Sequence, residues 1–225
     1  MNKDINKNNS NQVFLVMVGF SCNNNCVMCT TKPKEKYYQD RTTREILDDL
    51  KNGADQGFKK VEFTGGEPTI REDILSLIKY AKDLGYKEIA LSTNGRMLSY
   101  NDFTEKLIKN GVNRINFSLY GHNPKLHNAV TRTPKSFEQT IQGIKNVQKS
   151  SEVKIIVNTV VSKLNYRFLS DIGELLLSLK IKFFNILDLI PDGYAKDFYK
   201  TLVVRISDLS NALNNLETIL DLSLI

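Results

Sequence analysis

Six short apolar segments alternate along the chain with segments whose apolar residues recur at helical spacing. Each apolar segment has the length and composition of a strand that is buried on both faces. A helix between successive strands makes neighbouring strands parallel and their crossovers right-handed. The sequence therefore predicts an α/β fold with a parallel six-stranded sheet. The predicted strands occupy residues 13–20, 59–63, 87–91, 113–119, 153–161 and 181–189.

Capping signals mark the ends of several predicted helices. Capping boxes, in which a hydroxyl residue is followed three positions later by Glu or Gln, occur at residues 42–45, 69–72 and 136–139. A last amphipathic helix is predicted for residues 208–222. Three helices are expected to end at glycines, where a left-handed residue is favoured. These are Gly57, Gly85 and Gly111.

The number of strand–helix units limits the architecture. A closed TIM barrel of eight units typically takes about 250 residues. Six units in a chain of 225 residues favour a partial, open (β/α)6 barrel of the TIM type. Active sites in such folds gather at the carboxyl ends of the strands, so residues that follow the predicted strands are the first functional candidates.

Composition indicates one globular domain. A chain with 41% hydrophobic and 25% charged residues can bury one sizeable core. Residues 1–12 are polar and rich in Asn and Lys, which predicts a flexible arm before a core domain at residues 13–225. No apolar run reaches the roughly 18 residues that a membrane span needs, and no secretory signal is recognisable. A cytoplasmic location with no membrane partner is therefore predicted.

The positive charge raises the question of nucleic acid. The formal net charge is +6, but Lys and Arg are scattered over many segments rather than gathered on one. A solvated basic surface explains this distribution better than a nucleic-acid interface. Nucleic acid is therefore an unlikely partner, although the charge keeps an RNA substrate among the alternatives.

Cys22, Cys26 and Cys29 are the only cysteines in the chain. Three closely spaced thiols make a poor disulfide framework and indicate a metal site in a reducing compartment. A structural zinc site normally needs four ligands, and the only histidines, His122 and His127, lie far downstream. A [4Fe-4S] cluster fits better, because three thiolates leave one iron open to another ligand.

Further polar motifs follow the predicted strands. Gly65 and Gly66 allow close backbone approach to a ligand, and the Glu67 carboxylate suits an ammonium group. The same residues also suit an ordinary strand-to-helix turn. Ser92, Asn94 and Ser118 follow or end two further strands, where turn chemistry is an equal alternative for all three, especially for Asn94. Asn158 lies among apolar residues, and either faces the site or bridges neighbouring strands.

The Cys-x3-Cys-x2-Cys spacing, with Gly65-Gly66-Glu67-Pro68, Ser92-Thr93-Asn94-Gly95 and Ser118 in this order, resembles the radical S-adenosylmethionine (radical SAM) superfamily. The resemblance covers most of the chain. It implies that Cys22, Cys26 and Cys29 bind a [4Fe-4S] cluster whose open iron chelates S-adenosylmethionine. An electron from the cluster would then cleave the sulfur–C5′ bond and give a 5′-deoxyadenosyl radical that abstracts hydrogen.

The resemblance also suggests cofactor contacts. It assigns the amino group of S-adenosylmethionine to Gly65, Gly66 and Glu67. Ribose or carboxylate contacts are loosely assigned to Ser92, Asn94 and Ser118, and Asn158 is a further candidate from its position on the fifth strand. An adenine contact is assigned to Ile190, for which a role in the apolar core is an equal alternative. Met28 departs from the family pattern, since relatives often carry an aromatic residue there, but its thioether can still cover a purine.

The substrate is not identified by any motif. Two loops, residues 31–41 and 120–135, carry basic side chains suited to anionic groups. A small-molecule or peptide substrate and an external electron donor such as flavodoxin or ferredoxin are expected. The chain has no cysteine after Cys29, so it holds at most one cluster of this type. Two alternatives remain, namely a non-catalytic iron–sulfur carrier or sensor and an RNA-modifying radical SAM enzyme.

Overall fold

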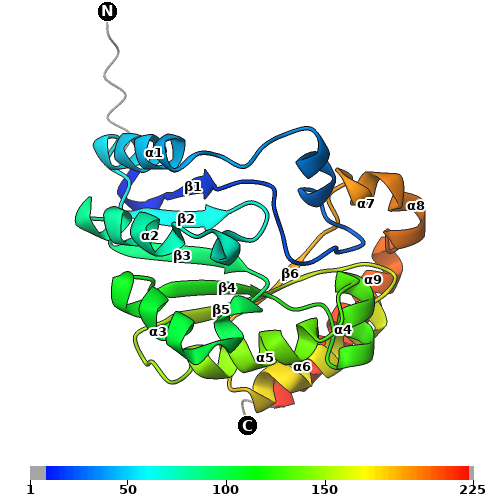
Figure 1. Ribbon diagram of the computed structural model, residues 1–225. Helices are drawn as coiled ribbons and strands as arrows, with labels where there is room; N and C mark the ends of the chain where they lie inside the picture. Colours follow the sequence, from blue (N-terminus) through cyan, green and yellow to red (C-terminus); the bar gives the residue numbers. More distant parts are fainter. Residues whose placement is uncertain (1–8, 223–225) are drawn as a thin grey trace, which may run out of the picture.

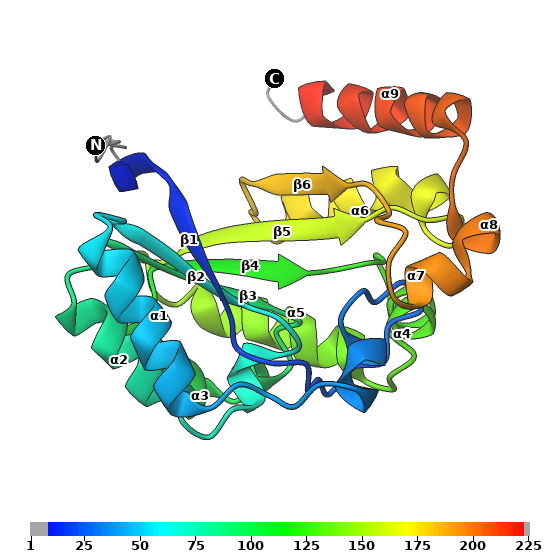
Figure 2. The ribbon, with the colours of Figure 1, turned by 90° about the horizontal axis from the view of Figure 1, so that it is seen from above.

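A computed structural model describes residues 9–222 of the chain, with side chains through Glu217. Six parallel strands form one sheet in the order β1-β2-β3-β4-β5-β6, and all their arrows point the same way in Figures 1 and 2. The first and last strands do not pair with each other, so the predicted open barrel is confirmed. The strands are β1 (Val13–Met17), β2 (Lys60–Thr64), β3 (Glu88–Thr93), β4 (Arg114–Ser118), β5 (Lys154–Val160) and β6 (Phe184–Leu187).

Helices follow the strands and lie along one face of the curved sheet, whereas α4, α7 and α8 lie near the carboxyl ends of the strands (Figures 1 and 2). The helices are α1 (Thr43–Asp55), α2 (Ile74–Asp83), α3 (Asn101–Asn110), α4 (Pro124–Thr131), α5 (Ser136–Val147), α6 (Leu169–Ser178), α7 (Tyr194–Asp197), α8 (Tyr199–Leu202) and α9 (Ile206–Leu222). Short 3-10 turns are η1 (Asn9–Asn11), η2 (Lys32–Lys36), η3 (Pro68–Ile70), η4 (Met97–Ser99) and η5 (Tyr166–Phe168).

Only one face of the sheet is fully buried, which corrects the expectation of strands buried on both faces. Side chains that point toward the helices, such as Val16, Phe63 and Phe117, are completely buried. On the opposite, concave face, Leu15 of β1 is 63% exposed and Met17 is 41% exposed. In the part of the chain that the structure describes, six strands do not close the barrel, so no facing strand covers this inner surface.

The inner face carries a charged network instead of a packed apolar layer. In the register of the sheet, Ala90 lies between Glu62 and Arg114. The Arg114 guanidinium donates to Glu62 at 2.6 Å and to Glu88 at 2.7 Å. The small side chain of Ala90 on β3 leaves room for the Arg114 side chain of β4 to extend to Glu62 on β2. The inner face is therefore built for polar contacts.

Two of the three predicted capping boxes are wrong. Thr42 caps α1 as predicted, with its side chain accepting from the Glu45 N–H while the Glu45 carboxylate accepts from the Thr42 N–H. Thr69, in contrast, lies in η3, and α2 begins only at Ile74. Ser136 is the first residue of α5 rather than its cap, and its hydroxyl donates to Asn128. The Thr69 hydroxyl donates to Glu67, two residues before it, and the Ser136 hydroxyl donates to Asn128 on the preceding helix, so neither hydroxyl caps the helix that the pattern assigned to it.

Two strands are shorter than predicted, since β1 ends at Met17 rather than at residue 20 and β6 spans Phe184–Leu187 rather than 181–189. The helix ends predicted at glycines agree with the structure. Gly57, Gly85 and Gly111 have positive φ angles of 85°, 88° and 126°, as their predicted places at helix ends require. Helix α9 packs on α6, where a Cβ on Gly173 would lie 2.5 Å from Leu216. Within residues 9–222, no helix combines the length and the apolar character needed to cross a membrane. Most of the predicted arm, residues 1–8, lies outside the described residues.

The Thr42 cap provides a test of this fold. Thr42→Ala removes the acceptor for the Glu45 N–H, and we expect the free energy of unfolding to fall by about 1 kcal/mol in urea denaturation. Thr42→Ser keeps the hydroxyl and should lose much less. Equal losses for both variants would contradict the capping role.

Candidate active site

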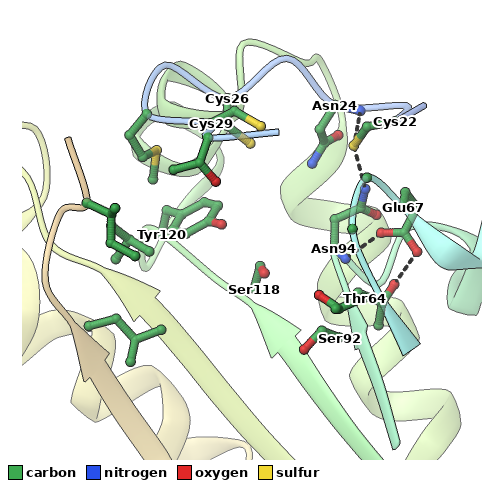
Figure 3. Close-up of a pocket in the computed structure, with 18 of the residues that line it drawn as sticks. Cys22, Asn24, Cys26, Cys29, Thr64, Glu67, Ser92, Asn94, Ser118 and Tyr120 are labelled. Atoms are coloured by element: carbon green, nitrogen blue, oxygen red, sulfur yellow. Dashed lines mark hydrogen bonds between the residues drawn. The ribbon is translucent and has the colours of Figure 1, made fainter. Parts of the chain in front are cut away.

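A cavity of about 490 Å³ opens at the carboxyl ends of the strands (Figure 3). This volume lies in the ordinary range of small-molecule sites. All three cysteines line it, together with residues from the ends of five strands. The lining consists of Cys22, Asn24, Cys26, Met28, Cys29, Thr30, Thr64, Gly65, Gly66, Glu67, Ser92, Thr93, Asn94, Ser118, Tyr120, Val160, Leu187, Asp188, Leu189 and Ile190.

The loop that carries the cysteines, residues 21–30 and here called the cysteine loop, is held by backbone contacts with α4 and its neighbours. The Asn25 N–H donates to the Thr131 carbonyl at 3.0 Å, and the Val27 N–H donates to the Val130 carbonyl at 2.9 Å. Arg132 adds a hydrogen bond from Nε to the Asn25 carbonyl. The irregular loop is thus tied to a regular element close to the cavity.

Hydrogen-bond donors already point at the thiols. The Asn24 N–H lies 3.4 Å from the Cys22 Sγ, and the Lys32 N–H lies 3.0 Å from the Cys29 Sγ. Such donors stabilise thiolate ligands of a metal centre. Burial raises the pKa of the Cys22 thiol to about 11 and also raises the pKa of Cys26. A metal would therefore have to displace protons from these thiols, as thiolate ligation normally does.

The arrangement fits a cluster better than a single zinc ion. Among the described residues, no three His, Cys, Asp or Glu side chains are grouped as one metal ion requires. His127 is 1% exposed and accepts a bond from the Tyr120 N–H, while His122 pairs with Asn123. Neither histidine lines the cavity. In a [4Fe-4S] cluster each thiolate binds a different iron, so three separated thiols around one cavity are compatible with it.

Gly65 and Gly66 pack against the start of the cysteine loop. A Cβ on Gly66 would lie 2.1 Å from the Ser21 carbonyl oxygen, and a Cβ on Gly65 would lie 2.5 Å from that of Gly19. The Gly66 N–H donates to the Gly19 carbonyl at 2.8 Å. The backbone of Gly65 and Gly66 thus approaches another group closely, as predicted, but that group is the protein backbone at residues 19–21. The same two glycines also line the cavity.

The Glu67 carboxylate is almost fully occupied by protein donors. Its Oε1 accepts from the Thr69 N–H, the Thr69 hydroxyl and the Thr93 hydroxyl, and its Oε2 accepts from the Asn94 N–H at 2.7 Å. Burial raises the pKa of Glu67, and these hydrogen bonds oppose that rise. Glu67 joins the loops after β2 and β3, a structural task that the sequence motif did not predict.

Ser92 is fixed by the charged network of the inner face. Its hydroxyl donates to Glu62 Oε1 at 2.5 Å, and the other oxygen of Glu62 is held by Arg114. The proton of the hydroxyl therefore points away from a cavity ligand. Ser92 can offer a ligand only its oxygen, as an acceptor.

The other predicted cofactor contacts divide into two groups. Met28, Asn94, Ser118 and Ile190 all line the cavity, and Ile190 is 66% exposed. Asn158 does not line it, because its Oδ1 accepts from Asn185 on β6 at 2.9 Å. Of the two roles predicted for Asn158, the structure thus shows the bridge between neighbouring strands.

Several lining residues escaped the sequence analysis. Thr64 and Val160 end β2 and β5, and Tyr120 and Leu189 follow β4 and β6, so proximity to a strand end was the available signal. Tyr120 is supported from behind by His127, whose ring stacks on it at 5.8 Å. Figure 3 shows the Tyr120 hydroxyl between the cysteines and Ser118.

Glu67 can be tested for its structural task without any cofactor. Glu67→Ala leaves the Thr93 hydroxyl and the Asn94 N–H without an acceptor, so we expect a loss of about 3 kcal/mol in the unfolding free energy of the cofactor-free protein. Ile190→Ala, at an exposed part of the cavity, should change it by less than about 0.5 kcal/mol. If Glu67→Ala lowered the free energy of unfolding by no more than Ile190→Ala does, the structural task of Glu67 would be contradicted.

His127 predicts a pH dependence of stability. Burial lowers its pKa from 6.5 to about 4, so the unfolded chain binds the proton more readily. The resulting stabilisation is present above pH 6.5, is lost as the pH falls toward 4, and amounts to about 3 kcal/mol. In urea denaturation, the free energy of unfolding should fall less steeply between pH 7 and pH 4 in His127→Gln than in the wild type. An unchanged slope in His127→Gln would contradict the assignment.

Comparison with known proteins places the chain in a family. The family model described as the Radical SAM superfamily matches residues 16–176. Probable GTP 3′,8-cyclases of Sulfurisphaera tokodaii and Saccharolobus solfataricus are each 30% identical to the chain over 179 and 180 residues, which is 80% of its length. The chain spans 56% and 58% of the length of these two relatives.

Solved structures share the fold. Streptococcus suis SuiB bound to S-adenosylmethionine gives a TM-score of 0.72 at 21% identity, over 93% of this chain and 47% of SuiB. The enzyme anSMEcpe, with bound S-adenosylmethionine and the Cp18Cys peptide, gives 0.74 at 18% identity, over 92% of this chain and 58% of its own. The matched residues 16–176 contain all three cysteines and the turns after β2, β3 and β4. The chain therefore belongs to the radical SAM superfamily, whose members use a [4Fe-4S] cluster and S-adenosylmethionine.

Proposed function

We propose that this chain binds a [4Fe-4S] cluster through Cys22, Cys26 and Cys29 and reductively cleaves S-adenosylmethionine. The observation that carries the proposal is the single cavity, which places the three thiols beside polar strand ends and an apolar wall. When bound, the cluster supplies the electron that cleaves the sulfur–C5′ bond, and the resulting 5′-deoxyadenosyl radical takes a hydrogen atom from the substrate.

The apolar wall is suited to the adenine ring. Met28 is 5% exposed and packs in one apolar group with Leu189 and Val130, while Ile190 projects into the open part of the cavity. A thioether and branched aliphatic groups can cover both an aromatic face and its edge. We therefore assign adenine to the space between the cysteine loop and the end of β6.

The polar wall is suited to the ribose and the carboxylate. Because Ser92 can only accept, it fits a ribose hydroxyl and not a carboxylate. Ser118 and Tyr120 both line the cavity, and each hydroxyl can donate a hydrogen bond to the carboxylate. Asn94 is tied to Asn23 and Arg96 and helps mainly to shape the wall.

The amino group of S-adenosylmethionine fits beside the turn after β2. Gly65 and Gly66 expose backbone there, and the Glu67 Oε2 accepts only one hydrogen bond, from the Asn94 N–H. The remaining lone pair and the negative charge suit an ammonium group. Glu67 would then serve the ligand and the loops at the same time.

The substrate is proposed to be a polar small molecule or a peptide. The inner face below the cavity carries Glu62, Arg114 and the Asn158–Asn185 pair, which suit a hydrogen-bonding substrate better than an apolar one. A purine nucleotide is the small-molecule candidate, because the 30% identical relatives are described as probable GTP 3′,8-cyclases. A peptide is the other, because SuiB was solved with its precursor peptide SuiA and anSMEcpe with a peptide.

The alternatives are less well supported by the cavity. An iron–sulfur carrier or sensor needs the thiols but has no use for a cavity that extends to Ser92 and Ile190. An RNA-modifying enzyme rests on the net charge of +6, and the Lys and Arg residues that produce this charge are scattered over many segments. An external electron donor such as flavodoxin or ferredoxin is part of the proposal in each enzymatic case.

Cleavage of the cofactor is the direct test. After anaerobic reconstitution with iron and sulfide, dithionite and S-adenosylmethionine are added and 5′-deoxyadenosine is measured by mass spectrometry. We expect the wild type to form 5′-deoxyadenosine. In Cys22→Ala, Cys26→Ala and Cys29→Ala, the amount of 5′-deoxyadenosine should fall to that of protein reconstituted without iron. Product from an iron-depleted variant would overturn the proposal. A loaded protein that binds no S-adenosylmethionine would favour the carrier.

A further inference from the structure

We infer that residues 192–194, in the loop that follows β6 and at the start of α7, form a positioning element for Cys29, here called the Cys29 latch. The latch comes from the opposite end of the chain and contacts the backbone at the last cysteine of the cysteine loop. The inference rests on the proposed cluster, and it assigns a positioning task to Gly193 and Tyr194.

Gly193 is the first part of the latch. Its backbone angles, φ 54° and ψ −135°, form a combination that only glycine adopts readily. A Cβ at this position would lie 2.6 Å from the Cys29 carbonyl oxygen and 2.8 Å from that of Thr30. Both the conformation and the close approach therefore exclude a side chain, and the latch backbone lies directly on the peptide that follows the cysteine.

Tyr194 is the second part. Its backbone N–H donates to the Cys29 carbonyl at 2.9 Å. Within the cysteine loop, the Cys29 N–H donates to the Cys26 carbonyl at 3.2 Å, and the Lys32 N–H reaches the Cys29 Sγ at 3.0 Å. The backbone N–H, the backbone carbonyl and the sulfur of Cys29 are thus each held by a hydrogen bond. The hydrogen bond to the carbonyl comes from the latch.

Side chains support the latch on both sides. Lys34 Nζ lies 2.6 Å from Asp192 Oδ2, and the Arg132 guanidinium lies 4.9 Å from the centre of the Tyr194 ring. The ion pair is half-exposed, so it contributes little to the free energy of folding. The close backbone fit of Gly193 and the Tyr194 hydrogen bond therefore carry the positioning.

The latch also connects the cysteine loop with the cavity wall. Leu189 and Ile190, which line the cavity, immediately precede it, and Ala195, which follows it, packs in one group with Met28 and Leu189. A short segment thus contacts the proposed adenine site at one end and Cys29 at the other. Movement of the latch would free Cys29 and open the adenine wall together.

Gly193→Ala with a matched control tests the latch. Gly57→Ala introduces the same kind of strain at φ 85°, but nothing lies within 4 Å of its added Cβ. Each protein is reconstituted anaerobically, and the loss of visible absorption is followed after an iron chelator is added. We expect Gly193→Ala to lose iron about 10-fold faster than the wild type, because loss of a partner that orients a metal ligand typically weakens metal binding by about that factor. Gly57→Ala should resemble the wild type. Equal rates for the two glycine variants would overturn the inference.

Tyr194 supplies a second pair of variants in case Gly193→Ala does not fold. Tyr194 is the first residue of α7, where proline is tolerated, so Tyr194→Pro removes the N–H donor with little cost to the helix. Tyr194→Ala removes the same ring but keeps the N–H. Faster iron loss in the proline variant than in the alanine variant supports the latch, and equal rates overturn it.

The outcome separates the latch from the proposed function. A wild-type chain that takes up no cluster overturns both. A wild-type chain that loads a cluster and cleaves S-adenosylmethionine, while the Gly193 and Tyr194 variants hold iron as their controls do, overturns the latch alone.

Discussion

The buried carboxylate of Glu67 is the interaction on which the site depends. It accepts hydrogen bonds from η3 and from the turn after β3, while its own N–H donates to the Ser21 carbonyl at the start of the cysteine loop. A carboxylate that is 2% exposed is stable only when such donors surround it. One residue thereby joins three segments, of which the cysteine loop and the turn after β3 line the cavity. Loss of the carboxylate would leave donors unpaired in η3 and in the turn after β3.

The open side of the barrel sets the character of the rest of the site. Because β1 and β6 do not pair, the concave face stays accessible, and it carries Glu62, Arg114 and Glu88 rather than an apolar layer. This network reaches the cavity through Ser92, whose hydroxyl it turns away from the ligand. The charged network on the concave face therefore determines which hydrogen bond Ser92 can offer in the cofactor site. The same network presents charge and hydrogen bonds to whatever enters the barrel.

The end of β6 closes the site from the other side. Leu189 and Ile190 provide an apolar wall, and the Cys29 latch binds the backbone of the last cysteine. The cysteine loop is thus held by α4 near Asn25 and Val27 and by the latch at Cys29. An irregular loop without regular hydrogen bonds of its own needs such external partners to keep three sulfurs in place. Both supports lie far from the loop in the sequence.

The sequence by itself determined the parallel open sheet and the place of the three cysteines, because apolar periodicity and strand–helix alternation are local properties that the chain displays directly. It also identified Met28, Gly65, Gly66, Glu67, Ser92, Asn94, Ser118 and Ile190, all of which line the cavity. Only the tertiary structure decided that Ser136 does not cap a helix, that Asn158 bridges strands and that Glu67 joins loops. It also revealed the latch at Gly193. The reason is physical: a hydroxyl, an amide or a carboxylate has several possible partners, and the partner is chosen by segments that meet only after the chain has folded.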